Sequence, residues 1–488
     1  MKKPFLILLL IILLGTFFRS YQLIEKFDYA HDGDLYSWIV KDIVVDGHFR
    51  LIGQLTSAQG LYIGPIFYYL LIPFFLIFNM DPVGATVPIT IMGILSVISY
   101  YFVFSKLFNQ KTGLIAAFLY AVLLQVVQLD RRVVPSTPTN LWVIWYFYCV
   151  VLISRGKYQV LPLLGVLISL IWHIHIALAP ALVAIPAAIL SSRKIPSIKN
   201  IFLFLVVTLI TSIPFLIFEL RHNFSQTLSF ISNFSTNHGG GVGLDKLNLI
   251  MIKVSSNIDK LFFSPQTFPF NHFLLVAIIL LLPIIIIKKK LLTIGEVIPM
   301  FVWVLGVIIF YTASSSPISE YYFANIEIIF LSIVSLTLYL IFNSSKAGQV
   351  IVLSILSIIL VKNIIQVTTQ SYYNKGYLER KGVAEYISKD AIGKGFPCVS
   401  VSYITQPGED VGFRYFFYLN NLHVNQSKSG SPNYTIVIPD EYASDAIDQK
   451  FGHIGVIKPD DIPSKEDISH SCSGQNSNLT DPMFGFSQ

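Results

Sequence analysis

The sequence predicts a polytopic α-helical membrane protein of about eleven transmembrane helices, followed by a small α/β domain. Two observations predict the membrane region: 54% of the 488 residues are hydrophobic and only 13% are charged. Soluble domains carry about 25% charged residues, so this composition indicates a chain surrounded by lipid. A third observation predicts the C-terminal domain, because apolarity falls and turn residues appear after residue 370.

The first apolar stretch, residues 4–18, follows Lys2 and Lys3. No small-x-small cleavage site follows it, so we interpret it as an uncleaved first helix rather than a signal peptide. The two lysines place the N-terminus in the cytoplasm. Residues 19–82 then form the first external loop.

The next apolar stretch, residues 63–78, contains Pro65 and Pro73 and is shorter than the roughly 20 residues of a full span. Lysines and arginines of the later loops fall on the cytoplasmic side only if this stretch does not cross. We therefore expect it to lie in the outer leaflet as a juxtamembrane helix. The predicted spans are 4–18, 83–105, 112–128, 140–153, 159–175, 176–191, 200–218, 271–287, 294–313, 322–342 and 347–369. They belong to a predicted membrane domain over residues 1–370. This odd number of crossings puts the C-terminus outside.

Residues 371–463 are expected to form the extracytoplasmic α/β domain, because segments with helical and strand patterns alternate in them. The predicted helices are 377–387 and 441–450, and the predicted strands are 398–402 and 434–438. The Ser/Asn/Gly-rich residues 464–488 are predicted to be a loose tail. Outside the cell Cys398 and Cys472 could pair, but their spacing does not decide it.

Candidate catalytic residues lie in residues 29–38, which read YAHDGDLYSW. Asp32 and Asp34 follow the first predicted membrane helix closely, and acidic groups at a bilayer edge are costly unless they face water or a polar cavity. They are therefore candidates for function. The alternative is a solvated loop in which an aspartate caps a helix, since apolar-periodic residues follow.

Other polar residues fall on the same predicted face of the membrane, whereas the cytoplasmic loops hold mostly Lys, Arg, Ser and Gly. This asymmetry predicts one polar site beside Asp32. The residues at this edge are Asp130, Arg131, Arg132, His173, His175, Glu219, Arg221, His222, Glu320 and Tyr321.

Four motifs in this order resemble those of the C-type (GT-C) glycosyltransferase superfamily, in its branch related to protein O-mannosyltransferases and lipid A aminoarabinose transferases. They are HDGDLYSW at residues 31–38, Gly-Pro-x-x-Tyr-Tyr at 64–69, Lys-Leu-Phe at 106–108 and GLIAAFLYAV at 113–122. The family carries an Asp-Glu or Asp-Gln pair in the first motif. Here Gly33 takes the second place and Asp34 is displaced by one residue. After Arg132 the family often has Asn-Pro or Asp-Pro, but this chain has Ser136-Thr137-Pro138.

The resemblance implies a multi-pass enzyme of the bacterial cell membrane that moves a sugar from a polyprenyl-phosphate donor to a lipid, glycan or protein acceptor. Asp32 would be the general base, with Asp34 as its neighbour. Arg132 or Arg221 would bind the departing phosphate. Neither the sugar nor the acceptor can be read from the sequence.

Several alternatives stay open. Arg131 and Arg132 could anchor a helix end to lipid headgroups. Glu219 and Arg221 could form a structural pair. His173 and His175 could line a polar cavity, or bind a divalent metal with Asp32 or Glu219. No cofactor is certain.

Other classes of protein are also considered. A transporter or flippase of an amphiphilic glycolipid would show repeats or polar groups at mid-membrane, which we do not find. A non-catalytic envelope assembly protein would bind through its C-terminal domain. The sequence has no P-loop, GxGxxG or HExxH motif. Its net charge of +6 is explained by membrane orientation rather than by nucleic acid.

Overall fold

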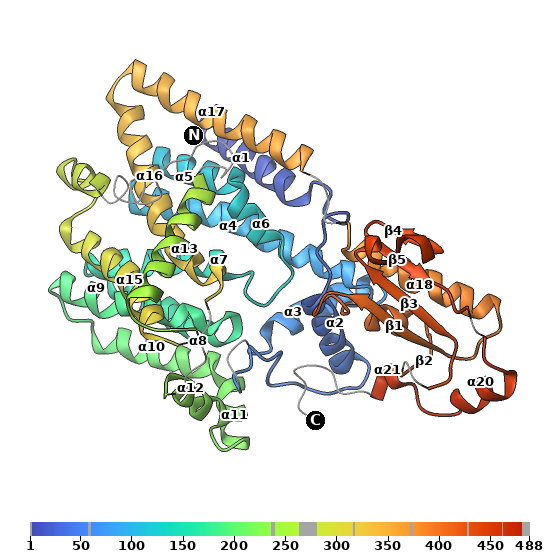
Figure 1. Cartoon of the computed structure of the whole chain (residues 1–488). Coiled ribbons are helices and arrows are strands. Elements are labelled where there is room, and N and C mark those ends of the chain that lie inside the picture. Colours follow the sequence, from blue (N-terminus) through green and yellow to red (C-terminus); the bar gives the residue numbers. More distant parts are fainter. Residues whose placement is uncertain are drawn as a thin grey trace.

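The computed structural model describes residues 2–56, 60–235, 240–262, 281–315, 318–370, 374–426, 429–460 and 462–480. Apolar stretches form helices because lipid offers no partner for backbone N–H and C=O groups. The helices of the membrane region are α1 (Lys2–Ser20), α4 (Thr86–Leu107), α5 (Gln110–Val122), α6 (Leu124–Arg131), α7 (Thr139–Ser154), α8 (Leu161–Ile174), α9 (Ala184–Ser192), α10 (Ile198–Thr211), α11 (Ile213–Arg221), α12 (Ser225–Ser235), α13 (Leu244–Phe262), α15 (Ile294–Ala313), α16 (Ala324–Ser344) and α17 (Lys346–Thr369), with short 3₁₀ turns η1 (Pro82–Ala85), η2 (Tyr158–Val160), η3 (Ile176–Val183) and η4 (Glu320–Phe323) between them (Figure 1).

In the described part of the chain, four helical segments are long and apolar enough to cross a membrane alone. They contain α4, α15, α16 and α17. The pairs α5–α6 and α10–α11 add two more if each bent pair is one span. The chain is therefore a multi-pass membrane protein, while the number of eleven crossings stays a prediction. Residues 271–280 of the predicted span 271–287 lie outside the described residues.

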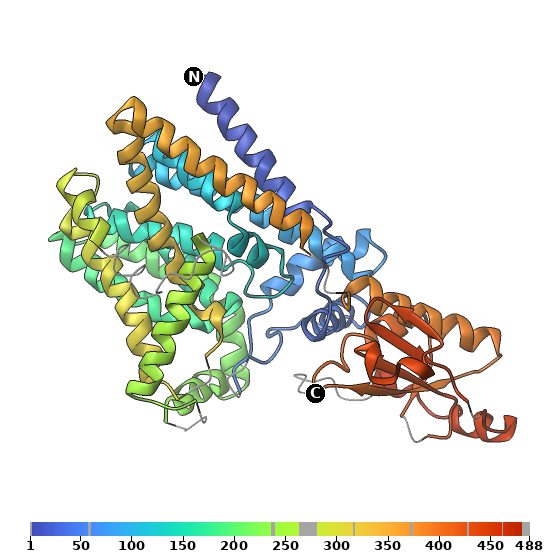
Figure 2. The ribbon, with the colours of Figure 1, turned by 45° about the horizontal axis from the view of Figure 1, so that its top comes forward.

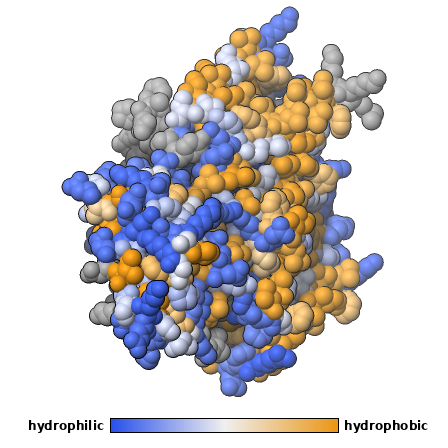
Figure 3. Space-filling view, turned by 90° about the vertical axis from the view of Figure 1, so that its right-hand side faces the viewer, coloured by the Kyte–Doolittle hydropathy of each residue, from blue (hydrophilic) through white to orange (hydrophobic). Residues whose placement is uncertain are grey.

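Apolar side chains also cover the outside of several helices, as expected for a surface in contact with lipid. Phe5 of α1, Phe202 of α10 and Ile358 of α17 are each more than 60% exposed. Figure 3 shows a face of the molecule on which apolar residues gather on one side and hydrophilic residues on the other.

Sequence analysis predicted one continuous helix over residues 112–128, but the structure divides it. The backbone of Leu123 is extended, and α5 and α6 meet there at a bend of 64°. Such a break leaves carbonyls that must find partners within the membrane. Arg19 donates from Nη1 to the carbonyl of Ala121 at 3.1 Å, and Asn363 donates from Nδ2 to the carbonyl of Val122 at 2.8 Å. These two side chains, distant in sequence, make the bend stable.

The predicted helix over residues 200–218 is also divided, with a bend of 59° between α10 and α11. Its cause is visible in the sequence, because Pro214 has no N–H and favours the first turn of a new helix. The hydroxyl of Ser212, at the break, donates to that of Ser169 at 3.1 Å. The helices α12 and α13 that follow were not predicted; α13 buries Ile250, Val254 and Ile258, spaced four residues apart, in the core of the membrane region.

Two juxtamembrane helices, α2 (His31–Val44) and α3 (Ile66–Ile77), lie between the membrane helices and the C-terminal domain, as both ribbon views show (Figures 1 and 2). They share one apolar core with that domain. The ring of Tyr29, which precedes α2, lies 4.7 Å from that of Phe416, and the ring of Trp38 lies 5.6 Å from that of Tyr415. The C-terminal domain therefore packs directly against the segment that carries Asp32.

The C-terminal domain is a five-stranded sheet with helices, which agrees with the predicted α/β class. The strand order is β2-β1-β3-β5-β4. Strand β1 pairs in parallel with β2 and with β3, while β5 pairs antiparallel with β3 and β4. The elements are α18 (Tyr377–Gly393), β1 (Val399–Thr405), α19 (Arg414–Leu419), β2 (Val424–Asn425), β3 (Asn433–Ile438), η5 (Asp440–Ala446), β4 (Gln449–Phe451), β5 (Ile454–Ile457), α20 (Lys465–Ser471) and α21 (Ser477–Thr480).

Two expectations for this domain differ from the structure. Residues 441–450 were predicted to be a helix, but they form η5 and the start of β4, because Gln449–Phe451 pairs with β5. Residues 464–488 were expected to be loose, but α20 and α21 form within residues 464–480 and a disulfide joins Cys472 to Cys398; residues 481–488 lie outside the described residues. A single cross-link over 74 residues holds this segment against the sheet.

Candidate active site

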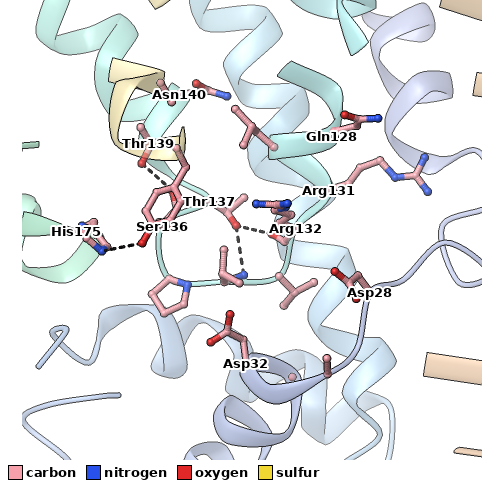
Figure 4. Close-up of a pocket in the computed structure, with 18 of the residues that line it drawn as sticks. Asp28, Asp32, Gln128, Arg131, Arg132, Ser136, Thr137, Thr139, Asn140 and His175 are labelled. Atoms are coloured by element: carbon pink, nitrogen blue, oxygen red, sulfur yellow. Dashed lines mark hydrogen bonds between the residues drawn. The ribbon is translucent and has the colours of Figure 1, made fainter. Parts of the chain in front are cut away.

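A cavity of about 880 Å³ opens between the start of α2, the bend of α5 and α6, and residues 132–140 (Figure 4). The bend creates this space, because α6 turns away from the course of α5 and its last turn lines the cavity. Side chains of both charges line it, including Asp28, Asp32, Arg131, Arg132 and His175. A polar cavity therefore lies beside Asp32, and some of the residues predicted for the site line it.

Asp32 lies in the first turn of α2, where the helix dipole favours a negative charge. It does not cap the helix, since the N-cap residue is Ala30 and no side chain caps it. The Asp32 side chain is 48% exposed and lines the cavity. Its Oδ1 accepts a hydrogen bond from Nε2 of Gln54 at 3.0 Å and lies 3.8 Å from Nδ1 of His31. The pKa of His31 is raised by this neighbouring carboxylate.

Asp34 faces the C-terminal domain instead of the cavity. It is 7% exposed, and its Oδ1 accepts a hydrogen bond from the backbone N–H of Tyr415 at 2.9 Å. Burial raises the pKa of Asp34 to about 6, although Arg414 and Arg380 nearby favour its charged form. The two predicted catalytic carboxylates are thus on different sides of α2, and Asp34 joins this helix to α19.

Replacing Asp34 with Asn is expected to stabilise the protein at pH 7.5. An amide oxygen can accept the same N–H from Tyr415 without placing a charge in the core. Because the pKa is about 6 in the folded protein and 3.8 ordinarily, the folded state holds an extra proton between these values. Stability contributed by this group therefore falls as pH rises through that range, by on the order of 3 kcal/mol.

Thermal unfolding in detergent would check this at two pH values. The Asn variant should exceed the wild type in Tm at pH 7.5 and lose most of that advantage at pH 4.5, where the wild-type carboxyl is protonated. If the Tm advantage of the Asn variant over wild type were smaller at pH 7.5 than at pH 4.5, the raised pKa of Asp34 would be contradicted.

Asp130 is buried behind the cavity wall in an ion pair with Arg19. Nη2 of Arg19 lies 2.6 Å from Oδ2 of Asp130, and the hydroxyl of Tyr120 and Nδ2 of Asn140 also donate to this carboxylate, at 2.9 and 3.1 Å. Of this group only Asn140 lines the cavity. Asp130 therefore orients Asn140 and joins α1 to α6, rather than meeting a ligand itself.

Replacing Arg19 with Leu is expected to destabilise the protein by about 3–5 kcal/mol, because it leaves the Asp130 carboxylate buried without a cation. Tm in detergent measures the change. The double variant Arg19→Leu/Asp130→Asn removes the stranded charge and should recover part of the lost stability. If the double variant were less stable than Arg19→Leu alone, the ion pair would not be the cause.

Arg131 and Arg132 are neighbours with different environments. Arg131 turns towards α1, and its guanidinium donates to the backbone carbonyls of Phe18, Tyr21 and Gln22 at 3.0–3.3 Å. Arg132 is exposed, and within the described residues its guanidinium has no hydrogen bond or ion pair. Arg132, directly after α6, and Asp32 of α2 both line the cavity, and in the view of Figure 4 they lie on either side of the loop that follows α6. The cavity lining thus includes a cation available to a ligand and a solvent-accessible carboxylate.

The histidines separate in a similar way. His175 lines the cavity, and its Nε2 lies 3.4 Å from the hydroxyl of Tyr321, which also lines it. His173 is buried elsewhere, packed on Gly64, and among the described residues both of its ring nitrogens lack a hydrogen-bond partner. Glu320 begins η4, but its side chain lies outside the described part of the structure.

The residues at the end of α11 lie outside the cavity. Glu219 is buried and accepts backbone N–H bonds from Gln226 and Thr227, at 2.9 and 3.0 Å, so it caps α12. Arg221 and His222 are exposed, and the His222 ring stacks on Phe218 at 4.0 Å. Among the described residues Glu219 does not pair with Arg221, because its carboxylate binds the first turn of α12 instead.

Several residues that line the cavity were not among the predicted site residues, namely Lys26, Asp28, Gln54, Gln128, Ser136, Thr137 and Asn140. Most have no pattern of their own, because only the fold brings their loops together. Asp28 was within reach of prediction, since it lies beside the YAHDGDLYSW segment. Within the described residues no group of three or more His, Cys, Asp or Glu is placed to hold a metal ion.

Comparison with known proteins gives two kinds of similarity. Residues 63–218 match the model of a family described as dolichyl-phosphate-mannose-protein mannosyltransferase. This match contains α3, the bend of α5 and α6, and the arginine pair, but not Asp32. No curated protein matches the sequence.

Solved structures with a similar fold cover nearly the whole chain. ArnT from Cupriavidus metallidurans in the apo state has a TM-score of 0.56 and 11% identity over 92% of this chain and 97% of that one. The same protein bound to undecaprenyl phosphate gives 0.55 and 11%, over 94% and 98%. The apo oligosaccharyltransferase of Archaeoglobus fulgidus gives 0.53 and 14%, over 95% of this chain and 76% of that one. The family match and this fold confirm the resemblance to C-type glycosyltransferases.

Proposed function

We propose that this chain, which has an ArnT-like fold, is an integral membrane glycosyltransferase. It moves a sugar from a polyprenyl-phosphate-sugar donor to a lipid, glycan or protein acceptor. One observation carries the proposal: Asp32 and Arg132 face one cavity of about 880 Å³, with the carboxylate accessible and the guanidinium open to a ligand. These are the two groups that such a transfer needs.

Asp32 acts as the general base in a single displacement. The acceptor oxygen or nitrogen attacks the anomeric carbon of the donor sugar while the bond between this carbon and the phosphate oxygen breaks. The acceptor proton passes to the Asp32 carboxylate, and the lipid phosphate leaves with the bonding electrons. A carboxylate in the first turn of α2 suits this role because it reaches the cavity.

Arg132 binds the departing phosphate. Negative charge grows on the phosphate as the bond breaks, so a guanidinium beside it stabilises the transition state more than the bound donor. Around these groups Ser136, Thr137 and Asn140 supply hydroxyl and amide groups suited to sugar hydroxyls. A cavity of this size has space for a sugar phosphate and the end of an acceptor.

The reaction takes place on the extracytoplasmic face of a bacterial cell membrane, with the N-terminus in the cytoplasm. The disulfide between Cys398 and Cys472 supports this side for the C-terminal domain, because disulfides persist in oxidising compartments. This domain packs on α2 and α3, so the cavity belongs to the same side.

The test is to incubate membranes containing the protein with a radiolabelled polyprenyl-phosphate sugar and to separate the products. Transfer predicts a new labelled product that is neither free sugar nor donor, and that is absent from membranes lacking the protein. If the label only changed leaflet, with no new covalent product, the protein would be a flippase. If neither occurred with any acceptor-containing membrane, the proposal would be wrong.

A further inference from the structure

We propose that Gln54, itself held by Tyr68, positions the Asp32 carboxylate for the proton transfer described above. Tyr68 is fully buried behind the cavity wall, while Gln54 is only 9% exposed and reaches the cavity beside Asp32. The inference rests on the proposed function, because it assigns the support of the same general base. No sequence motif marks Gln54.

Gln54 lies on a short hairpin of the first external loop. The backbone N–H of Gly53 donates to the carbonyl of Ile63 at 2.6 Å, and the N–H of Ile63 donates to the carbonyl of Gln54 at 2.9 Å. Trp172 fixes the hairpin to the end of α8, since its indole N–H donates to the carbonyl of Tyr62 at 3.0 Å. The position of the Gln54 backbone is therefore set by a membrane helix.

Two hydrogen bonds between Gln54 and the Tyr68 hydroxyl fix the orientation of the amide. The hydroxyl oxygen accepts from the backbone N–H of Gln54 at 3.0 Å, and the hydroxyl proton goes to Oε1 of Gln54 at 3.1 Å. Because Oε1 accepts the proton of the Tyr68 hydroxyl, the NH₂ group of Gln54 points away from Tyr68. It donates to Oδ1 of Asp32 at 3.0 Å.

This orientation restrains the Asp32 side chain. The N–H donor holds Oδ1, so that Oδ2, which has no hydrogen bond among the described residues, is left for the acceptor proton. A base restrained in this way loses less entropy when it meets its substrate.

Close packing shows that the arrangement is built into the fold. A Cβ atom on Gly53 would lie 2.0 Å from the ring of Tyr68, so only glycine lets this ring reach Gln54. A Cβ atom on Gly64, just after the hairpin, would lie 2.2 Å from the ring of His173. Both glycines bring the hairpin close to its neighbours, and neither has a positive φ.

The charged groups that line the same cavity as Asp32 do not change when Gln54 or Tyr68 is replaced. They are His31 on the same helix, Asp28 and Lys26 before it, and Arg131 and Arg132 from the end of α6 onwards. A change in Asp32 reactivity on substitution of Gln54 therefore reports the lost N–H donor.

Kinetics of sugar transfer provide the first test. Gln54→Leu is expected to lower kcat by about tenfold to hundredfold, the effect of one hydrogen bond to a charged group, with KM for the donor lipid little changed. Tyr68→Phe should lower kcat less, because the amide can then flip. In the double variant Tyr68→Phe should add nothing to Gln54→Leu, whereas independent packing effects would multiply.

Tyr69→Phe is the matched control. Tyr69 is the next residue of α3, and its hydroxyl donates to the backbone carbonyl of Arg50 at 3.0 Å, away from Gln54. This variant should keep the wild-type kcat. If Gln54→Leu fails to fold, Gln54→Glu keeps the shape but faces Asp32 with a carboxylate, and it should lower kcat at least as far.

A second measurement does not depend on transfer. Carbodiimides react with accessible carboxyl groups, and the Gln54 amide occupies Oδ1 of Asp32, so the Asp32 peptide of Gln54→Leu and Tyr68→Phe should be labelled several-fold faster than that of wild type or Tyr69→Phe. Unchanged labelling and unchanged kcat in Gln54→Leu would overturn the positioning role and leave the proposed function standing. Faster labelling in a protein that shows no transfer would overturn the function and keep the contact.

Discussion

Replacing Asp32 with Asn is expected to reduce sugar transfer by about 10²–10⁴-fold, the usual contribution of a general base. An amide of the same shape can still occupy the first turn of α2, but it cannot take the acceptor proton. Binding of the donor lipid should persist, because the proposed phosphate ligand is Arg132, which this substitution leaves unchanged. Transfer of radiolabel and donor binding, measured on the same purified protein, check both parts.

Asp34→Asn is the matched control for this experiment. It makes the same chemical change two residues along α2, at a carboxylate that contacts Tyr415 instead of lining the cavity. It should retain transfer activity. If Asp32→Asn were fully active, or if Asp34→Asn were the inactive variant, Asp32 would not be the base.

Replacing Arg132 with Ala is expected to lower kcat/KM by about tenfold to a few hundredfold, because charge-assisted hydrogen bonds to the phosphate are lost. Much of the loss should appear in kcat, since the charge on the phosphate grows in the transition state. Arg132→Lys keeps the charge without the planar donor pair and should recover only part of the activity. Initial rates at several donor concentrations separate the two constants.

Arg221→Ala is the corresponding control, since Arg221 is also an exposed arginine following a broken span but lies outside the cavity. Its transfer rate should match the wild type. Loss of activity in Arg221→Ala with normal activity in Arg132→Ala would move the phosphate site to the end of α11.

The membrane fold was largely predictable, because a run of apolar residues has one stable form in lipid. Predicted helices over residues 83–105, 140–153, 294–313, 322–342 and 347–369 correspond to α4, α7, α15, α16 and α17 within a few residues. The bend at Leu123 could not be predicted. Neither proline nor glycine marks it, and its carbonyls are satisfied by Arg19 and Asn363 from other helices.

The candidate site was predicted in part. Asp32, Arg131, Arg132, His175 and Tyr321 do line one cavity. Four other predicted residues do not line the cavity, although they are also ionisable and lie at the same edge of the membrane helices. They are Asp34, Asp130, His173 and Glu219. Each is buried against another element. Asp34 contacts Tyr415 and Asp130 contacts Arg19, while His173 packs on Gly64 and Glu219 caps α12. Hydropathy assigns a depth to a residue, but it does not tell which side of a helix meets solvent.

By itself the sequence determined that the chain is a multi-pass membrane protein with a small α/β domain, and that acidic and basic groups gather near the ends of its apolar segments. These properties follow from composition and from the order of polar and apolar residues, which act locally. Only the tertiary structure decided that Asp32 and Arg132 line one cavity while Asp34 faces α19, and that Gln54 reaches Asp32. Those contacts join segments distant in the chain, and their geometry depends on how α2, the hairpin and the bend of α5 and α6 pack together.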